Sequence, residues 1–270
     1  MEVALGFGIA FIIAITGVGA GTITAPLLIL VLHVPVVVSV GTALAYSTVV
    51  KAVVVPVQIV RKQVAWRVLG VMLLGGIPGV MAGSLLFRRY VSPGNHGVFY
   101  GVLGMIIVLS AAWHLYRHFR PGSFAGERRT RQGWIAALMF PIAAEVGFAS
   151  SGAGAMGTLV LMGLSSLDAA KVVGTDLTFA FCMTLTGSAI HFANGLFDSA
   201  LLLRLTVGGV LGAVAGSWVA PRVPSRHLRL ALSVCLVVLG LTFCYKGFEK
   251  QVTGVGSWAS TQMAARIANR

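Results

Sequence analysis

Five long stretches of this chain contain almost no charged side chains, and this feature constrains the fold more than any other. They cover residues 36–60, 68–87, 97–116, 199–220 and 228–245. A helix needs about 20 apolar residues to cross the hydrocarbon core of a bilayer, and each stretch is close to that length. Charged residues make up only 10% of the chain, far below the roughly 25% of a soluble domain. The sequence therefore predicts an all-α, polytopic integral membrane protein.

The chain also contains an internal repeat. Three tripeptides recur at an offset of 133 residues (152 minus 19): GAG at 19–21 and 152–154, VGT at 40–42 and 173–175, and AGS at 82–84 and 215–217. Recurrence at one fixed offset is the signature of a duplicated unit. We therefore expect two homologous repeats of four hydrophobic segments each.

The basic residues indicate how these repeats are joined. The formal net charge is +13, but the lysines and arginines gather in the connections, which is typical of a membrane topology signal and not of nucleic-acid binding. The predicted organisation is a first membrane repeat at 1–118, a cytoplasmic basic linker at 119–133, a second membrane repeat at 134–247 and a C-terminal tail at 248–270.

Each repeat opens with a glycine-rich break inside an apolar segment. Glycine costs about 1 kcal/mol relative to alanine inside a helix, so a duplicated cluster needs a reason. One reason is close helix packing through small residues. The other, which we favour, is a broken helix whose free backbone N–H groups hold an anion near the middle of the bilayer. The expected substrate-binding residues at the breaks are Gly19, Ala20, Gly21 and Thr22 in the first repeat, and Ser151, Gly152, Ala153 and Gly154 in the second.

The glycine-rich turn, VGT on the next helix, AGS on the third, and their recurrence in the second half resemble the sulfite exporter TauE/SafE family of membrane transporters. The resemblance covers about residues 5–245. It implies export or uptake of a small anion such as sulfite or an organosulfonate, coupled to an ion gradient by a proton or another cation. The glycine turns commonly read GGG in that family and read GAG here. We also expect Thr42 and Thr175, the threonines of VGT, at the substrate site.

Two topologies fit the apolar pattern. If residues 3–33 and 134–164 each cross the membrane once, each half has four spans and the halves are parallel. If each is a re-entrant hairpin, each half has three full spans and the repeat is inverted. With the tail left aside, the hairpin topology places the loop lysines and arginines on one side, except Arg88 and Arg89. We favour inverted repeats, with the linker in the cytoplasm and both chain ends outside.

A few charged or titratable residues fall inside the apolar stretches. A charge at the centre of a spanning helix costs about 2.5 to 3.5 kcal/mol on insertion scales, so such residues are candidates for function. Lys51 is the clearest and is expected to attract the anion. Asp176 and Glu145 either neutralise Lys51 structurally or serve in coupling, and Asp176 and His191 are further candidates for the substrate site, His191 also fitting a polar helix end.

The remaining function classes are limited by what the sequence lacks. It has no nucleotide-binding loop, no catalytic triad with supporting context and no metal-ligand spacing, so neither an enzyme nor a cofactor is expected. A secondary transporter of the cytoplasmic (inner) membrane with alternating access is favoured, with a passive anion channel or facilitator as the alternative. The expected partners are the lipid bilayer, the small anion and a coupling proton or cation. No sequence feature specifies an oligomeric state.

Overall fold

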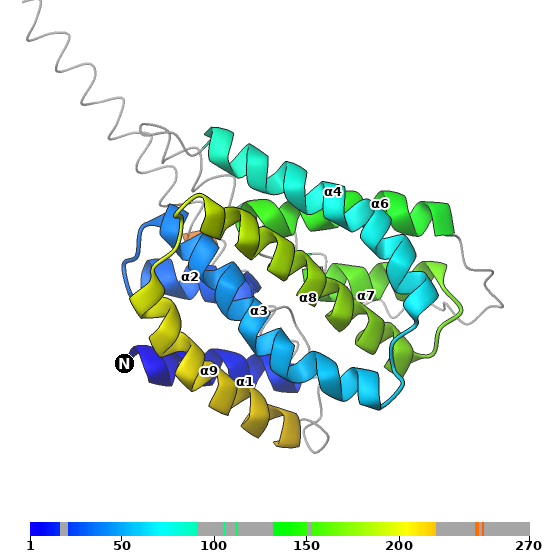
Figure 1. The fold of residues 1–270 in the computed structure, drawn as a ribbon, viewed down its shortest axis with the longest axis horizontal. Coiled ribbons are helices and arrows are strands. Elements are labelled where there is room, and N and C mark those ends of the chain that lie inside the picture. Colours follow the sequence, from blue (N-terminus) through cyan, green and yellow to red (C-terminus); the bar gives the residue numbers. More distant parts are fainter. Residues whose placement is uncertain are drawn as a thin grey trace, which may run out of the picture.

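The computed structural model describes residues 1–16, 21–90, 132–150 and 153–219, and the isolated positions 105, 108, 112, 241, 242 and 245. Within these residues every regular element is an α-helix (Figure 1), as predicted. The helices are α1 (Glu2–Thr16), α2 (Gly21–Leu30), α3 (Val36–Val60), α4 (Trp66–Tyr90), α6 (Gln132–Ala149), α7 (Ala153–Leu164), α8 (Ala169–Ala193) and α9 (Ser199–Val219).

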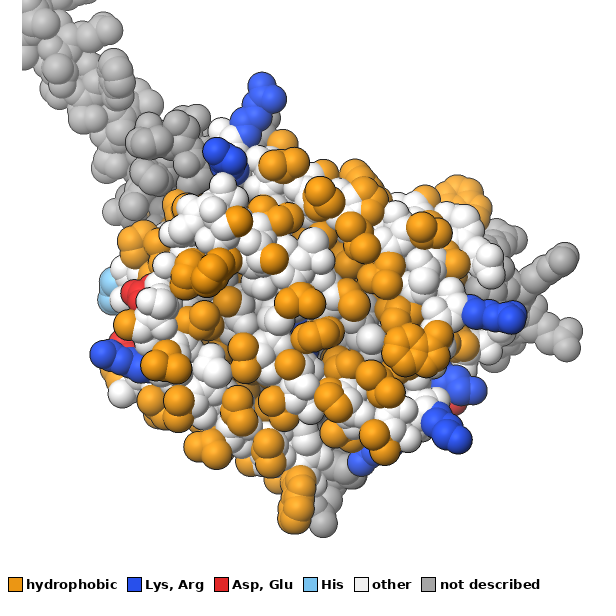
Figure 2. Space-filling view, viewed as in Figure 1, with side chains coloured by type: hydrophobic (Ala, Val, Ile, Leu, Met, Phe, Trp, Pro, Cys, Tyr) orange, Lys and Arg blue, Asp and Glu red, His pale blue; other side chains and the backbone are white. Residues whose placement is uncertain are grey.

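Five of the described helices are long and apolar enough to cross a bilayer, namely α3, α4, α6, α8 and α9. The spans predicted at 36–60, 68–87 and 199–220 correspond to α3, α4 and α9. Those predicted at 97–116 and 228–245 lie almost entirely outside the described residues. Figure 2 shows hydrophobic side chains over the whole visible face, with lysine and arginine side chains confined to its edges. Such a surface suits contact with lipid.

The two central helices, α3 and α8, end in the same way. Lys62 follows α3 with a left-handed backbone φ of 56°, and Gly195 follows α8 with a φ of 67°. The two positions are 133 residues apart (195 minus 62), which is the offset of the sequence repeat. Glycine adopts this backbone conformation without cost, and the lysine adopts it at the equivalent position.

Helices of one half pack against helices of the other half through glycines. The glycines recur every four residues, and a side chain in their place would meet the backbone of the partner helix. The contacts are Gly75–Ala136, Gly79–Phe140 and Gly83–Ala144 between α4 and α6, and Gly208–Val3, Gly212–Phe7 and Gly216–Phe11 between α9 and α1. Each contact of one interface corresponds to a contact of the other at the same offset (208 minus 75, and 136 minus 3, both 133). Small residues thus let helix backbones approach closely, as is usual in membrane bundles.

Two hydrogen bonds between the halves repeat this exchange. Thr175 Oγ1 in α8 accepts from the backbone N–H of Ala65 at 2.9 Å, just before α4 begins. Thr42 Oγ1 in α3 accepts from the backbone N–H of Asp198 at 3.1 Å, just before α9 begins. Each VGT threonine therefore binds the start of a helix in the other repeat. Reciprocal contacts of this kind are what a two-fold relation between two units produces.

The central helices α3 and α8 run antiparallel. Residue numbers rise along α3 and fall along α8 through the contacts Gly41–Leu196, Thr48–Ser188 and Gln63–Gly174, the first and last of which lie at or just beyond a helix end. Figure 1 shows the N-terminus and the α2–α3 connection at one end of the bundle, and the start of α6 and the α7–α8 connection at the opposite end. The α1–α2 and α6–α7 pairs thus each return to the end at which they began.

Candidate functional site

Lys51 lies inside the bundle, on the face of α3 that is turned toward α8. Its exposed fraction is only 3%. Thr48, one turn earlier on the same face, lies 3.5 Å from Ser188 of α8, measured between the two hydroxyl oxygens. Ser47 is also one turn before Lys51 and is fully buried, and its hydroxyl has no hydrogen-bond partner among the described residues. A buried ammonium and a buried hydroxyl therefore lie on neighbouring positions of one helix.

Asp176 is the second buried charge, on α8, with an exposed fraction of 1%. Its Oδ2 accepts a hydrogen bond of 2.6 Å from the hydroxyl of Thr158 in α7, and its Oδ1 has no partner among the described residues. A side chain at Gly157 would overlap this carboxylate, so the glycine lets the carboxylate lie directly against α7. One carboxylate oxygen is thus held in place and the other is left unpaired in the protein interior.

Lys51 and Asp176 interact electrostatically, but they do not form a direct ion pair. The expectation that Asp176 or Glu145 neutralises Lys51 is therefore met by Asp176 only through space. Glu145 lies in the second half of α6, is half-buried and has interactions of its own. The ammonium of Lys51 is left with no direct carboxylate partner in the described part of the chain.

His191 lies near the end of α8 and is buried, with 2% of its surface exposed. Its Nε2 is 3.2 Å from the carbonyl oxygen of Gly147, and its ring packs edge-on against Phe87 with 5.0 Å between ring centroids. Because a carbonyl oxygen only accepts, Nε2 carries the proton, and Nδ1, which has no described partner, is an acceptor in the neutral ring. His191 thus presents a lone pair, which faces an anion favourably only after protonation.

The threonines of VGT have a structural role in this conformation. Thr42 and Thr175 are buried, and both hydroxyls accept from helix-start N–H groups of the other repeat, as described above. They lie on α3 and α8, the same helices as Lys51 and Asp176. Their predicted contact with substrate would require that these hydrogen bonds open.

The glycine breaks coincide with ends of helices. In the first repeat α1 ends at Thr16 and α2 begins at Gly21, and in the second α6 ends at Ala149 and α7 begins at Ala153. Thr22 and Gly154 lie in the first turns of α2 and α7, while Gly19, Ala20, Ser151 and Gly152 lie outside the described residues. Ser150, at a left-handed φ of 58°, is buried and its hydroxyl has no described partner.

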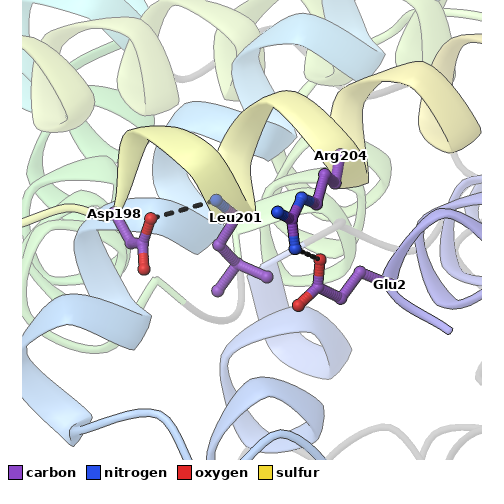
Figure 3. A network of polar contacts seen from close by, with 4 residues as sticks. All are labelled: Glu2, Asp198, Leu201 and Arg204. Carbon is purple, nitrogen blue, oxygen red and sulfur yellow. Dashed lines mark hydrogen bonds and ion pairs between the residues drawn. The ribbon is translucent and has the colours of Figure 1, made fainter.

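Charges at the start of α1 and α9 lie apart from this interior group. Arg204 Nη1 donates to Glu2 Oε2 at 3.0 Å, and both side chains reach the surface (Figure 3). Asp198 accepts from the backbone N–H of Leu201 at 3.0 Å through Oδ1 and so caps α9. These contacts hold α1 to α9 and stabilise a helix end.

Ser47, Gly157, Thr158 and Ser150 were not predicted from the sequence. Serine, threonine and glycine are common in membrane helices, and only their positions relative to charged residues mark them out. Ser47 is one turn from Lys51, and this spacing could have identified it. Nothing in the sequence indicates that Gly157 and Thr158 meet Asp176, because that contact depends on how α7 packs against α8.

Comparison with known proteins identifies the family. The profile described as "Sulfite exporter TauE/SafE" matches residues 3–243. The chain belongs to the sulfite exporter TauE/SafE family. It is also 24% identical, over 245 residues, to the "Probable membrane transporter protein YjnA" of Bacillus subtilis (strain 168), an alignment that covers 88% of this chain and 96% of that protein. No solved structure matches the chain.

TauE/SafE membership agrees with the fold. Proteins of this family are membrane transporters and not enzymes, and the described helices include five that can span a bilayer. The chain is therefore a multi-pass membrane transporter. Among the described residues no group of three or more His, Cys, Asp or Glu side chains is arranged to hold a metal ion, and the half-buried Cys182 is a free thiol.

Proposed function

We propose that this protein is a secondary transporter for a small sulfur oxyanion, sulfite or an organosulfonate, and that Lys51 binds the anion. The observation that carries this proposal is the burial of Lys51 on the α3–α8 contact without a direct ion pair in the described residues. An ammonium in a membrane bundle is expensive unless an anion approaches it, and intramembrane charges usually mark a substrate path. The family description, which names sulfite, supplies the class of anion.

The neighbouring groups suit such a substrate. The hydroxyl of Ser47 is one turn from Lys51 and free to donate to an anion oxygen. The glycine breaks lead directly into α2 and α7, and the first N–H groups of a helix lack intrahelical acceptors. Free N–H groups at helix starts favour anions. Lysine is a flexible point charge and can follow an oxyanion that moves through the site.

Alternating access is supported by the antiparallel course of α3 and α8. These helices occupy equivalent positions in the two repeats, and both are long enough to span the bilayer. Equivalent spans that run in opposite directions belong to an inverted repeat, whose two halves can exchange conformations to open the site to either side. With the basic linker in the cytoplasm, both chain ends then lie outside. A passive channel on the same fold would need no such exchange.

The proposal is tested by replacing Lys51 with glutamine. We expect Lys51→Gln to fold but to lose both the rise in melting temperature that sulfite or methanesulfonate causes in the purified protein and the flux in proteoliposomes, because binding to the folded state is what stabilises it. The matched control is Lys171→Gln, at an exposed lysine of α8 that pairs weakly with Asp168. Normal anion binding and flux in Lys51→Gln would refute the role of Lys51. Saturable flux with counterflow supports a transporter, whereas unsaturated flux without counterflow supports a channel.

A further inference from the structure

The buried charges of the described bundle balance each other. Among the described residues, Lys51 and Asp176 are the buried side chains that carry a full charge in their ordinary ionised forms. One is positive and one is negative, and they interact electrostatically without touching. The empty site is therefore close to electrically neutral.

Adding an anion disturbs this balance. A monoanion beside Lys51 would leave one net negative charge in a region from which water is largely excluded. Transfer of an uncompensated ion from water into such a region costs several kcal/mol even after the protein relaxes. A transporter that binds its anion tightly enough to carry it must therefore bring a compensating positive charge with it.

Asp176 is placed to accept that charge as a proton. Its Oδ1 has no hydrogen-bond partner among the described residues and so can carry a proton without breaking a contact. Its Oδ2 stays held by the hydroxyl of Thr158, because the absence of a side chain at Gly157 keeps the carboxyl group against α7. The protonation would leave the geometry of the site intact.

The surroundings of Asp176 offer few other groups for this role. Helix α7 carries no titratable side chain, and the ones on α3 that lie inside the bundle are Lys51 and Tyr46. On α6 the titratable group is Glu145, which is half-buried, and the arginines of α4 lie exposed at its two ends. Lys51 is the described charge that acts on Asp176 through space. Further along α8 itself, His191 is occupied by the carbonyl of Gly147.

We propose that Asp176 binds one proton for each monoanion that Lys51 binds, so that the two cross the membrane together without net charge. This inference rests on the proposed function, since it assumes that Lys51 binds the anion. The proton is taken from water on the side where the anion enters and is returned to water on the other side. After release, the carboxylate of Asp176 again compensates Lys51, and the empty site returns neutral. The direction of transport then follows from the anion and proton gradients.

The experiment uses methanesulfonate, which is a monoanion throughout the working pH range, and the full-length protein in proteoliposomes. In the wild type we expect a pH gradient to drive uptake, with the acidic side as the source, and a potassium–valinomycin potential of either sign to leave the rate unchanged. In Asp176→Asn the empty site keeps the charge of Lys51. We therefore expect net uptake to lose its response to the pH gradient and to become sensitive to the potential, while methanesulfonate exchange stays within about threefold of wild type.

The matched control is Asp168→Asn, which makes the same chemical change at an exposed carboxylate just before α8. It should keep wild-type coupling. A second variant, Thr158→Val, removes the donor to Oδ2 and keeps a side chain of similar shape. We expect it to move the pH at half-maximal uptake upward, because loss of a donor disfavours the ionised carboxylate. This variant tests the proposal even if Asp176→Asn does not fold.

The outcomes separate this inference from the proposed function. Proton-driven, potential-insensitive uptake in Asp176→Asn, an unchanged pH profile in Thr158→Val, or potential-driven uptake in the wild type would each overturn the inference. If Lys51→Gln abolishes binding in the same preparations, the proposed function survives that failure. Normal binding and transport by Lys51→Gln would overturn both.

Discussion

The contact between Gly157 and Asp176 yields a prediction whose size can be worked out from the structure. The Cβ of an alanine at position 157 would lie 3.0 Å from Asp176 Cγ and would overlap Oδ1. Carbon atoms in ordinary contact are about 3.5 to 4.0 Å apart, so the carboxyl group must move by about 0.5 to 1 Å. The 2.6 Å hydrogen bond from Thr158 would then lengthen beyond the normal O–H···O range. We therefore expect Gly157→Ala to displace the carboxylate from α7.

The energetic cost of this displacement can be isolated with a control on the same helix. Gly163 in α7 has no other atom within 4 Å of where its Cβ would lie. Both Gly157→Ala and Gly163→Ala gain the helix propensity of alanine, about 1 kcal/mol, so this gain cancels between them. Overpacking of a buried contact costs about 1 to 3 kcal/mol. Gly157→Ala should therefore be less stable than Gly163→Ala by about that amount.

Two measurements test this reasoning. Reversible unfolding in mixed detergent micelles compares the free energies of unfolding of the two variants. Uptake in proteoliposomes compares their response to a pH gradient, which Gly157→Ala should weaken and Gly163→Ala should keep. Equal stability together with equal coupling would refute the argument that the missing side chain at Gly157 positions Asp176.

Two further predictions concern the relation between the repeats. Thr175→Val and Thr42→Val should each lower the free energy of unfolding by about 0.5 to 1.5 kcal/mol, because each leaves one helix-start N–H without its acceptor; a loss in one variant alone, seen in thermal unfolding, would contradict equivalent roles for the two threonines. A reporter fused after Arg270 should be active outside the cytoplasm, as the inverted repeat requires, and activity restricted to the cytoplasm would instead favour four plain spans in each half.

The sequence predicts the spans well because a bilayer imposes a length and a polarity on each of them. The run at 36–60 is α3 with the same two ends, since Pro35 precedes it and the basic residues Arg61 and Lys62 follow it. The sequence repeat also anticipates equivalent helix ends, such as those at Lys62 and Gly195. It does not indicate that α1 packs on α9 and α6 on α4, because a repeat says which segments are alike and not which half each one faces.

The charged part of the candidate site is predictable for a similar reason. Lys51 and Asp176 are conspicuous because an apolar run rarely contains an ionised side chain, and the structure buries both. Their partners are not conspicuous. Thr158 meets Asp176 only because α7 returns alongside α8, and that path depends on the turn at the second glycine break. The substrate contacts expected at the glycine breaks stay a prediction.

The two halves share their packing but not their charges. At the offset of 133 residues, Lys51 corresponds to Thr184 and Asp176 to Ala43, so each half contributes one charge that the other lacks. If the repeats exchange conformations during transport, the packing contacts are replaced by equivalent ones, and their contribution to the energy difference between the two states largely cancels. The electrostatic surroundings of Lys51 and Asp176 have no such counterparts and do not cancel. The free-energy difference between the two access states is then governed by these two residues and by whatever anion and proton they hold, which ties the conformational change to the occupancy of the site.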